Sequence, residues 1–226
     1  MKSWVKKMSR IILIVNRRTS RQFTVYNSQF TARDYFKEIT METLQEIQKF
    51  ASHAHEGQER KYEPGPYIIH PIHVMEICSE YTADKNVLAA ALLHDVLEDT
   101  SVTEEQLNKY LTSVMPSEDA RLVLLYVIEL TDVYTKSDFP EWNRRKRKMK
   151  EHKRLSVASP GAQTIKYADI IDNSRSVVTA DTDFAEKYLH EHRSLLKELR
   201  QGELRLRNRA IETVNECLER LKTAHA

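Results

Sequence analysis

Four ionisable residues follow one another within two helical turns in the middle of this chain: His94, Asp95, Glu98 and Asp99. Residues four apart share one face of a helix, so a continuous helix stacks His94 on Glu98 and Asp95 on Asp99. Apolar residues fill nearly every position from Leu88 up to this group, which predicts a buried core helix. Carboxylates on such a helix are costly unless they are paired, hydrogen-bonded or bound to a metal.

The adjacent His94 and Asp95 could offer an imidazole nitrogen and a carboxylate oxygen to one cation. Glu98 and Asp99, one turn further on, would then lie beside that cation without binding it. The alternative is a helix that turns its polar face to water near its C-terminal end. Spacing alone favours neither interpretation.

A cation held by two residues needs further ligands, and a catalytic site keeps positions open for water. Two distant stretches could supply them. The first is residues 53–57, where His55 lies at the end of a predicted helix. The second is residues 166–173, where Asp169 and Asn173 are four apart and share one helix face. An amphipathic helix explains either stretch alone, but three such stretches in one chain favour a shared site.

The composition describes a globular helical protein. The chain has 226 residues, 41% of them hydrophobic and 30% charged, so it can bury a sizeable core. With only 4 Gly and 6 Pro there are few breaks between helices. The formal net charge of +2 argues against a dedicated nucleic-acid-binding protein. No apolar run is long enough to span a bilayer, and Cys78 and Cys217 match no paired motif. We therefore expect a cytoplasmic protein with no nucleic-acid or membrane partner.

Helix signals continue along the chain from residue 31. They predict helices over 31–55, 72–81, 88–100, from 103, and over 117–130, 139–157, 162–178, 182–199 and 203–222. Thr103 and Gln106 resemble a capping box, and Pro160 suits a first helical turn. Before these helices, residues 11–15 and 23–26 are β-branched or aromatic runs that form either a short hairpin or a poorly ordered extension. The prediction is an all-α domain over 30–226 with an N-terminal extension over 1–29.

Four motifs occur in order between residues 55 and 175: His55-Glu-Gly-Gln-Glu-Arg60-Lys61, Pro66-Tyr67-Ile-Ile-His70-Pro71, Ala89-Ala-Ala-Leu-Leu-His94-Asp95-Val-Leu-Glu98-Asp99-Thr100 and Ile165-Lys-Tyr-Ala-Asp169-Ile-Ile-Asp172-Asn173. Each is weak alone, but the ordered set is specific. Together they resemble the HD-domain hydrolases of the RelA/SpoT homologues. The chain is too short for the other regions of the long members, so it is similar to a small stand-alone alarmone hydrolase such as the metazoan SpoT homologues. The resemblance implies an HD-domain helical bundle.

The resemblance also implies an activity and a role for each matching residue. The reaction would remove the 3′-pyrophosphate of (p)ppGpp, a guanine nucleotide alarmone. One divalent cation, Mn²⁺, would be bound by His55, His94, Asp95 and Asp169. Glu98 and Asp99 would orient and deprotonate the attacking water. The substrate would be contacted by Arg60, Lys61, Asn173, Arg147 and Lys148. The roles of Tyr67 and His70 stay open, and a structural histidine is as good an account of His70.

Two features limit what the resemblance implies about substrate. Residues 144–154 form the densest basic stretch, and for most of them a solvated helix face is the better interpretation. Tyr167 and Asp172 stand where the long members often have Leu and His, which puts the base specificity in doubt. A phosphohydrolase acting on NADPH or another nucleotide is therefore an alternative. A nucleotide-binding protein with a dormant HD core is an alternative of another class.

Overall fold

The computed structural model describes residues 32–179 and 182–224, so the predicted N-terminal hairpin and its alternative lie outside the described residues. Packing divides the chain into two units, 1–43 and 44–226, and the second contains most of the described helices. Within the described ranges the backbone is helical, with one isolated β-bridge between Glu59 and Pro66. The all-α prediction is confirmed. No helix of this part combines the length and the apolar character needed to cross a membrane.

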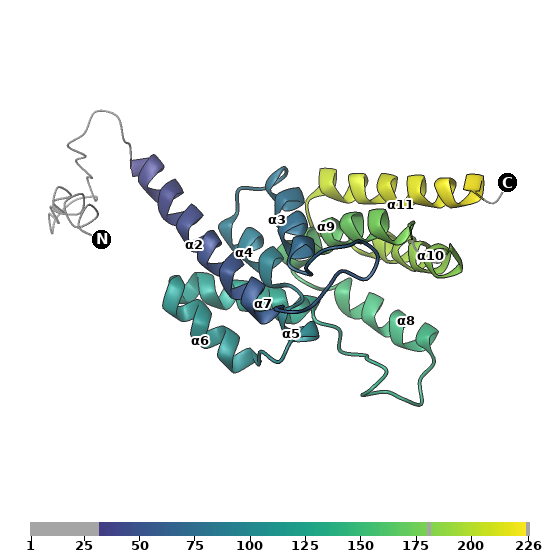
Figure 1. Ribbon diagram of the computed structural model, residues 1–226, viewed down its shortest axis with the longest axis horizontal. Helices are drawn as coiled ribbons and strands as arrows, with labels where there is room; N and C mark the ends of the chain where they lie inside the picture. The colour runs from purple at the N-terminus through teal and green to yellow at the C-terminus, as the bar shows by residue number, and fades with distance from the viewer. Residues whose placement is uncertain (1–31, 180–181, 225–226) are drawn as a thin grey trace, which may run out of the picture. The chain divides into compact units, whose positions relative to one another are not determined.

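Most of the helices follow one another with short connections, and two longer loops cover residues 55–68 and 131–143 (Figure 1). They are α2 (Ala32–Ala54), α3 (Ile69–Ser79), α4 (Lys85–Leu93), α5 (Val96–Asp99), α6 (Glu104–Val114), α7 (Ser117–Leu130), α8 (Arg144–Leu155), α9 (Pro160–Val177), α10 (Thr182–Glu198) and α11 (Leu204–Ala224). The predicted capping box of Thr103 and Gln106 is present at α6, and Pro160 does open α9. Helix α3 begins at Ile69, earlier than predicted, which places His70 in its first turn.

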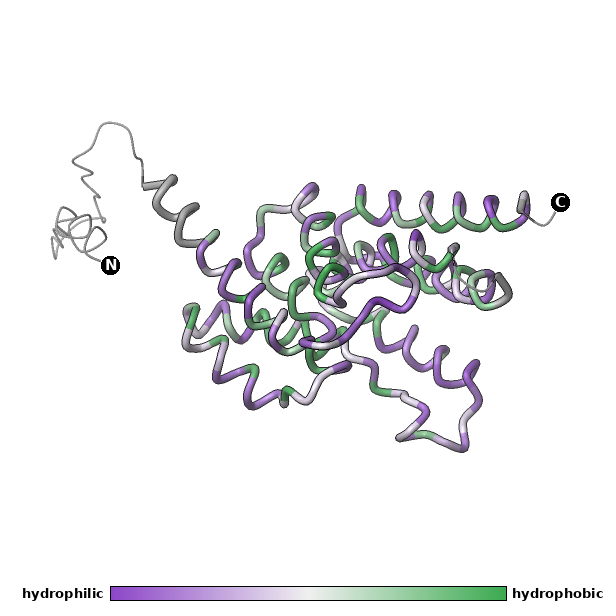
Figure 2. The backbone as a smooth tube through the Cα atoms, viewed as in Figure 1, coloured by the Kyte–Doolittle hydropathy of each residue, from purple (hydrophilic) through white to green (hydrophobic). Residues whose placement is uncertain are grey.

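Helix α9 lies at the centre of the larger unit. It packs against α3, α4, α7, α10 and α11 (Figure 1), and nearly all of its residues are buried. Ile165, Ala168 and Ile171 fill the core between these helices. Hydrophobic residues gather along the inner sides of α3 and α4 in Figure 2, whereas α8 is hydrophilic along nearly its whole length. Helix α9 buries charged and polar side chains as well as apolar ones. A buried polar side chain is costly without a hydrogen-bond or ion-pair partner, so those on α9 need specific partners.

The predicted continuous helix over 88–100 is wrong at one point. Helix α4 ends at Leu93, His94 and Asp95 form a turn, and the single turn α5 follows. The Nδ1 atom of His94 donates to the carbonyl of Ala91 at 2.8 Å. An unbroken helix would offer that carbonyl to the amide of Asp95. The side chain of His94 therefore competes with the helix backbone, and the chain bends at the two residues whose chemistry matters most.

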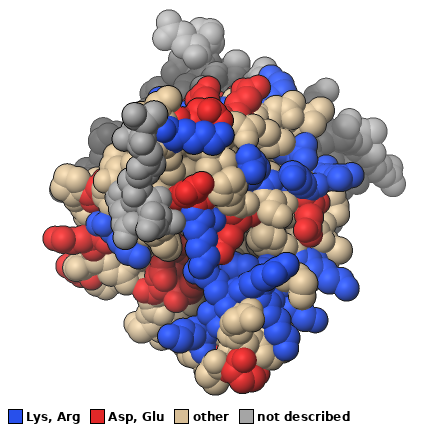
Figure 3. All heavy atoms as spheres, turned by 90° about the vertical axis from the view of Figure 1, so that its right-hand side faces the viewer, with Lys and Arg blue, Asp and Glu red and all other residues tan. Residues whose placement is uncertain are grey.

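Helix α8 begins later than predicted, at Arg144 and not near residue 139. The preceding loop is closed by aromatic packing, with the rings of Phe139 and Trp142 centred 4.6 Å apart. Asn143 then caps α8 by accepting from the amide of Lys146 at 2.9 Å. Lys and Arg side chains gather in the lower half of the face shown in Figure 3, at the height of α8 in Figure 1. Arg144 connects α8 to α10 through a two-pronged ion pair with Glu191.

Candidate active site

Ligand atoms from α3 and from the turn between α4 and α5 converge in the core. Nitrogen or oxygen atoms of His70, His94 and Asp95 all lie within 4.8 Å of one another, a spacing that suits a metal ion. The Nε2 atom of His70 is 3.5 Å from Asp95 Oδ2, and that of His94 is 3.1 Å from the same oxygen. Both histidines are buried. The bend at His94 and Asp95 brings these two residues against α3.

The far ring nitrogens of these histidines are already occupied. His94 Nδ1 donates to the carbonyl of Ala91, and His70 Nδ1 donates to Asp172 Oδ2 at 2.7 Å. These partners hold a proton on Nδ1 of each ring and direct Nε2 of each ring into the cluster. Nε2 of His94 is buried without a hydrogen-bond partner. A buried lone pair left unpaired is costly, and a bound cation would remove that cost.

Asp169 adds a further carboxylate from α9. Its Oδ1 lies 3.3 Å from Nε2 of His70 and 3.9 Å from that of His94. Lys166 donates to its Oδ2 at 2.7 Å and Asn173 to its Oδ1 at 2.5 Å, as expected for residues on one helix face. The Lys166 charge and the hydrogen bond from His70 outweigh the burial that would raise the pKa of Asp169, and hold it well below its usual range. Asp169 is therefore a fixed negative charge at the cluster.

The hydroxyl of Tyr67 binds both Asp95 and Asp99, the two carboxylates that sequence spacing placed on one helix face. It lies 2.6 Å from Asp95 Oδ2 and 2.9 Å from Asp99 Oδ2. Asp95 and Asp99 do therefore lie next to each other, despite the break in the helix. Burial and the two neighbouring negative charges raise the pKa of Tyr67, so the phenol stays a proton donor.

Glu98 points to a different neighbour. Its Oε2 accepts from the backbone amide of Asp132 at 2.9 Å, although the residue as a whole is exposed. Loss of water around the carboxyl group and the charge of Asp132 raise the pKa of Glu98 to about 7. For Asp99, desolvation and the charge of Asp95 also raise the pKa. Two carboxyl groups next to the cluster are thus less acidic than ordinary ones, which suits proton transfer near neutral pH.

His55 lies beside the cluster and outside the group of atoms that converge on one point. Its Nδ1 donates to Gln58 Oε1 at 2.8 Å, and the amide of Gln58 donates to the carbonyl of Asp99 at 2.7 Å. The ring packs on Tyr67 with centroids 4.7 Å apart. Like that of His94, its Nε2 is buried without a hydrogen-bond partner. The position sequence analysis gave to His55 in the ligand group is filled in this geometry by His70.

Mutual attraction shifts the pKa values within the cluster. Burial lowers the pKa of His70, but hydrogen bonds to Asp169 and Asp172 and the charge of Asp95 outweigh it and raise the pKa to about 10. Burial likewise opposes the charge of Asp95, which is held at a lowered pKa by the neighbouring His94 and His70. The carboxylates thus create a site that favours a positive charge. The mixture of imidazole and carboxylate donors fits a first-row divalent metal.

The cationic residues predicted to contact substrate lie in different settings. Arg60 is buried and donates to Asp172 and Ser176, while Lys61 is exposed. Arg147 donates to the carbonyl of Trp142. Lys148 is 3.1 Å from Asp132 Oδ2. Lys61 and Lys148 keep partial access to solvent, whereas the guanidinium group of Arg60 is committed to protein partners.

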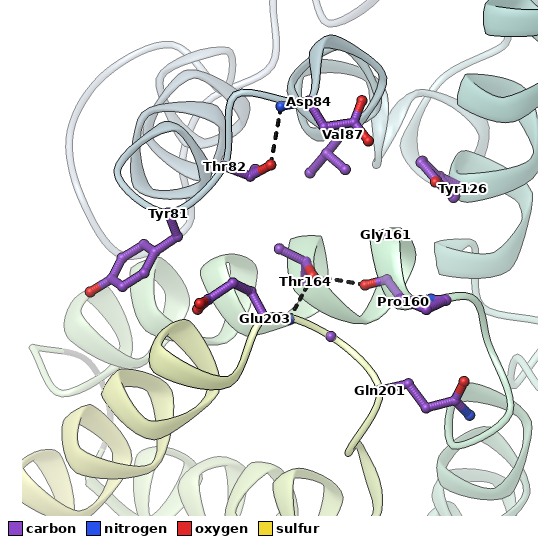
Figure 4. A pocket seen from close by; sticks show the side chains of 11 residues that line it. Tyr81, Thr82, Asp84, Val87, Tyr126, Pro160, Gly161, Thr164, Gln201 and Glu203 are labelled. Atoms are coloured by element: carbon purple, nitrogen blue, oxygen red, sulfur yellow. Dashed lines mark hydrogen bonds between the residues drawn. The ribbon is translucent and has the colours of Figure 1, made fainter.

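A separate open pocket of about 380 Å³ lies at the other end of α9, between the starts of α4, α9 and α11. Figure 4 shows Thr164 between Pro160 and Glu203, with Tyr81 and Tyr126 on opposite sides of the pocket. None of the residues that line this pocket belongs to the cluster of His70, His94 and Asp95. Its polar groups are bound mainly to backbone, so this pocket is part of the architecture.

Sequence analysis left the roles of Tyr67 and His70 open and gave Lys166 no role in the site. One signal was available: Tyr67 and His70 are three apart, directly before Pro71 in the first turn of α3. This spacing aims both side chains to one side of a helix start. The spacing of Lys166 and Asp169 is an equally plain signal, because a lysine three residues from a buried carboxylate is its natural partner.

Comparison with known proteins places the chain in a family. Residues 48–195 match the model of the HD domain. A guanosine-3′,5′-bis(diphosphate) 3′-pyrophosphohydrolase of Vibrio cholerae is 36% identical over 150 residues, which are 65% of this chain and 19% of that protein. The enzyme of that name called MESH1 in Xenopus tropicalis is 33% identical over 70% of this chain and 82% of its own length. Mouse MESH1 is 36% identical over 59% of this chain and 69% of its own length.

A solved structure agrees with this placement. It is described as a metazoan orthologue of SpoT that hydrolyses ppGpp, and it superposes with a TM-score of 0.62 at 27% identity. The match covers 79% of this chain and 94% of that structure. The chain thus spans about a fifth of the Vibrio relative but most of the small metazoan ones. Its fold, its ordered motifs and its histidine and aspartate cluster agree with one conclusion: the chain belongs to the HD-domain family, among the homologues of the MESH1 and SpoT hydrolases.

Proposed function

We propose that this protein is a manganese-dependent hydrolase that removes the 3′-pyrophosphate of (p)ppGpp, giving GDP or GTP and pyrophosphate. The observation that carries this proposal is the convergence of His70, His94 and Asp95, with Nε2 of each histidine aimed at one point. The names of the metazoan and bacterial relatives support the substrate. We assign the activity to residues 30–226, leave residues 1–29 as an extension, and expect it to work in the cytoplasm.

In this proposal the metal is held by His70, His94, Asp95 and Asp169. His70 takes the place that sequence analysis gave to His55. Mixed nitrogen and carboxylate ligands suit Mn²⁺. When bound, the metal lowers the pKa of a water molecule and neutralises charge on a phosphoryl oxygen.

Glu98 and Asp99 act as the acid–base pair. The raised pKa of Glu98, about 7, lets its carboxylate accept a proton from water near neutral pH. Asp99 is held in place by the hydroxyl of Tyr67, which also fixes Asp95. We propose that Asn173 and Lys166, both bonded to Asp169, complete the wall that faces the nucleotide.

Cations at the edge of the site meet the phosphates. Lys61 and Lys148 retain access to solvent, and Arg147 lies on the same helix as Lys148. A substrate with several negative charges gains most from cations that are partly free to move toward it. Arg60 is the exception among the predicted contacts, because protein groups already use its donors.

The second candidate substrate is NADPH or another nucleotide. What favours it is the carboxylate of Asp172, which binds Arg60, a residue that the resemblance gave to the substrate. Loss of that substrate contact leaves the metal cluster intact and alters which nucleotide fits.

Product analysis tests both candidates. Purified protein is incubated with Mn²⁺ and ppGpp, pppGpp, NADPH or GTP in parallel, each with an EDTA control. Pyrophosphate released from ppGpp and pppGpp, and lost with EDTA, is the expected result. Orthophosphate released from NADPH or GTP alone would keep the metal site and replace the substrate. Tight nucleotide binding with no turnover and no metal requirement would point to a dormant core.

A further inference from the structure

One buried carboxylate next to the candidate metal centre has three side-chain partners. Asp172 Oδ2 accepts from His70 Nδ1 and from an Nη atom of Arg60, each at 2.7 Å. Its Oδ1 accepts from His73 Nδ1 at 3.1 Å. The residue is 8% exposed. A buried carboxylate with this many charge-assisted partners is held in one orientation.

That orientation determines where His70 points. Because Nδ1 donates to Asp172, Nε2 is the nitrogen that faces the cluster. It lies 3.3 Å from Asp169 Oδ1 and 3.5 Å from Asp95 Oδ2, where it would bind a metal ion in place of a proton. Without an acceptor at Nδ1 the ring could carry its proton on either nitrogen and rotate. The carboxylate therefore selects both the tautomer and the ring angle.

Arg60 in turn holds Asp172. Its side chain is 6% exposed, and the same Nη atom that meets Asp172 donates to Ser176 Oγ at 2.8 Å. Glu63 pairs with its other Nη atom at 2.9 Å. Two residues more than a hundred positions apart in sequence are thus joined directly behind His70. The guanidinium group is thus almost enclosed by protein and pairs with two carboxylates.

We propose that Asp172 is a positioning residue for the metal-binding His70, and that Arg60 serves this carboxylate and not the substrate. The inference rests on the proposed function, since it assumes that His70 binds the metal. A carboxylate behind a ligating histidine fixes the ring and increases the electron density at the free nitrogen. The chain therefore uses Arg60, Asp172 and His70 as one unit that ends at the metal.

The first test measures metal binding directly. Protein freed of metal is titrated with Mn²⁺, and free Mn²⁺ is followed by electron paramagnetic resonance. Asp172→Asn keeps the shape of the side chain and removes its charge, so the dissociation constant should rise by about 10- to 100-fold. The matched control is Glu63→Gln, which removes the other ion pair of Arg60 and should leave Mn²⁺ binding unchanged. Thermal melts confirm that both variants are folded.

Arg60→Gln supplies an independent variant. With Mn²⁺ saturating, the KM for ppGpp should stay at the parent value, while the Mn²⁺ dissociation constant rises less than in Asp172→Asn. The double variant should be no worse than Asp172→Asn alone, because both changes act through the same carboxylate. A raised KM at saturating Mn²⁺ with unchanged metal affinity would instead make Arg60 a substrate contact and overturn the proposal.

The outcomes separate this inference from the proposed function. Parent protein that binds no Mn²⁺ would overturn both. Parent protein that binds Mn²⁺, with a folded Asp172→Asn variant that binds it equally well, would overturn only the positioning role. A weakened Asp172→Asn variant beside an unaffected Glu63→Gln control supports it.

Discussion

The two halves of α9 bury polar side chains to different ends. In the N-terminal half, Gln163 donates to three backbone carbonyls and accepts from the backbone amide of Gln201 at 2.8 Å. In the C-terminal half, Asp169 and Asp172 have titratable side chains as their main partners. Backbone partners keep a polar side chain hydrogen-bonded at every pH, so such a side chain stabilises the fold. Titratable partners leave charge and lone pairs that a ligand can use, which builds a site.

The largest expected effect follows from removing a carboxylate in the C-terminal half. Asp95→Ala or Asp169→Ala should abolish both turnover and Mn²⁺ binding, because each takes a ligand from the proposed metal centre. Asp169→Ala also leaves Lys166 buried without its partner, so Asp169→Asn serves as the milder form. The measurements are Mn²⁺ titration and pyrophosphate release, with circular dichroism to confirm the fold. Full activity in Asp95→Ala would remove the basis for the proposed site.

A smaller effect is expected for the neighbouring acid–base group. Glu98→Gln should lower kcat by about 10²- to 10⁴-fold while Mn²⁺ stays bound. The carboxylate form is the active base, so kcat of the parent should fall as the pH drops below about 7, the pKa of Glu98. The variant should lose this dependence. If metal affinity falls in parallel with kcat, Glu98 is a ligand and not a base.

Sequence reasoning succeeded where local geometry decides the outcome. The capping box at Thr103 and the shared face of Asp169 and Asn173 depend on residues three or four apart, and both are present. The same reasoning failed at His94 and Asp95. There a side chain took a backbone carbonyl from the helix, and apolar periodicity carries no information about such competition.

The remaining parts of the site depend on contacts between distant segments. The sequence left open whether His70 points into the metal cluster or is a structural histidine. The register of α3 against α9 decides this, and no local pattern specifies that register. Arg60 lay in a motif that implied substrate contact, yet Asp172 lies close enough to bind it. The sequence already shows an Asp at position 172, where the long members often have His. That this carboxylate binds Arg60 is shown only by the fold.

A substitution in the N-terminal half of α9 should lower stability and leave catalysis unchanged. Gln163→Leu keeps much of the volume but leaves the carbonyls of Leu155, Ser156 and Ala158 without their shared donor. We expect the free energy of unfolding to fall by about 3 kcal/mol, with kcat of the folded protein unchanged. Urea unfolding at fixed Mn²⁺ measures the first quantity and steady-state kinetics the second. A kcat loss without destabilisation would mean that the two halves are not separate in role.

The smallest effect should come from Thr164, at the wall of the open pocket in Figure 4. Its hydroxyl donates to the carbonyl of Pro160 at 2.7 Å and accepts from the amide of Glu203 at 3.0 Å. Thr164→Val keeps the shape and removes both bonds. Since water in the pocket can reach the amide of Glu203, the loss should be about 1 kcal/mol, less than for the enclosed Gln163. Thr164→Ser, which keeps the hydroxyl, is the control. If Thr164→Ser destabilises the protein as much as Thr164→Val, the two hydrogen bonds of the hydroxyl contribute no more than the methyl group that the serine lacks. A changed Mn²⁺ affinity in either variant would join this end of α9 to the metal centre.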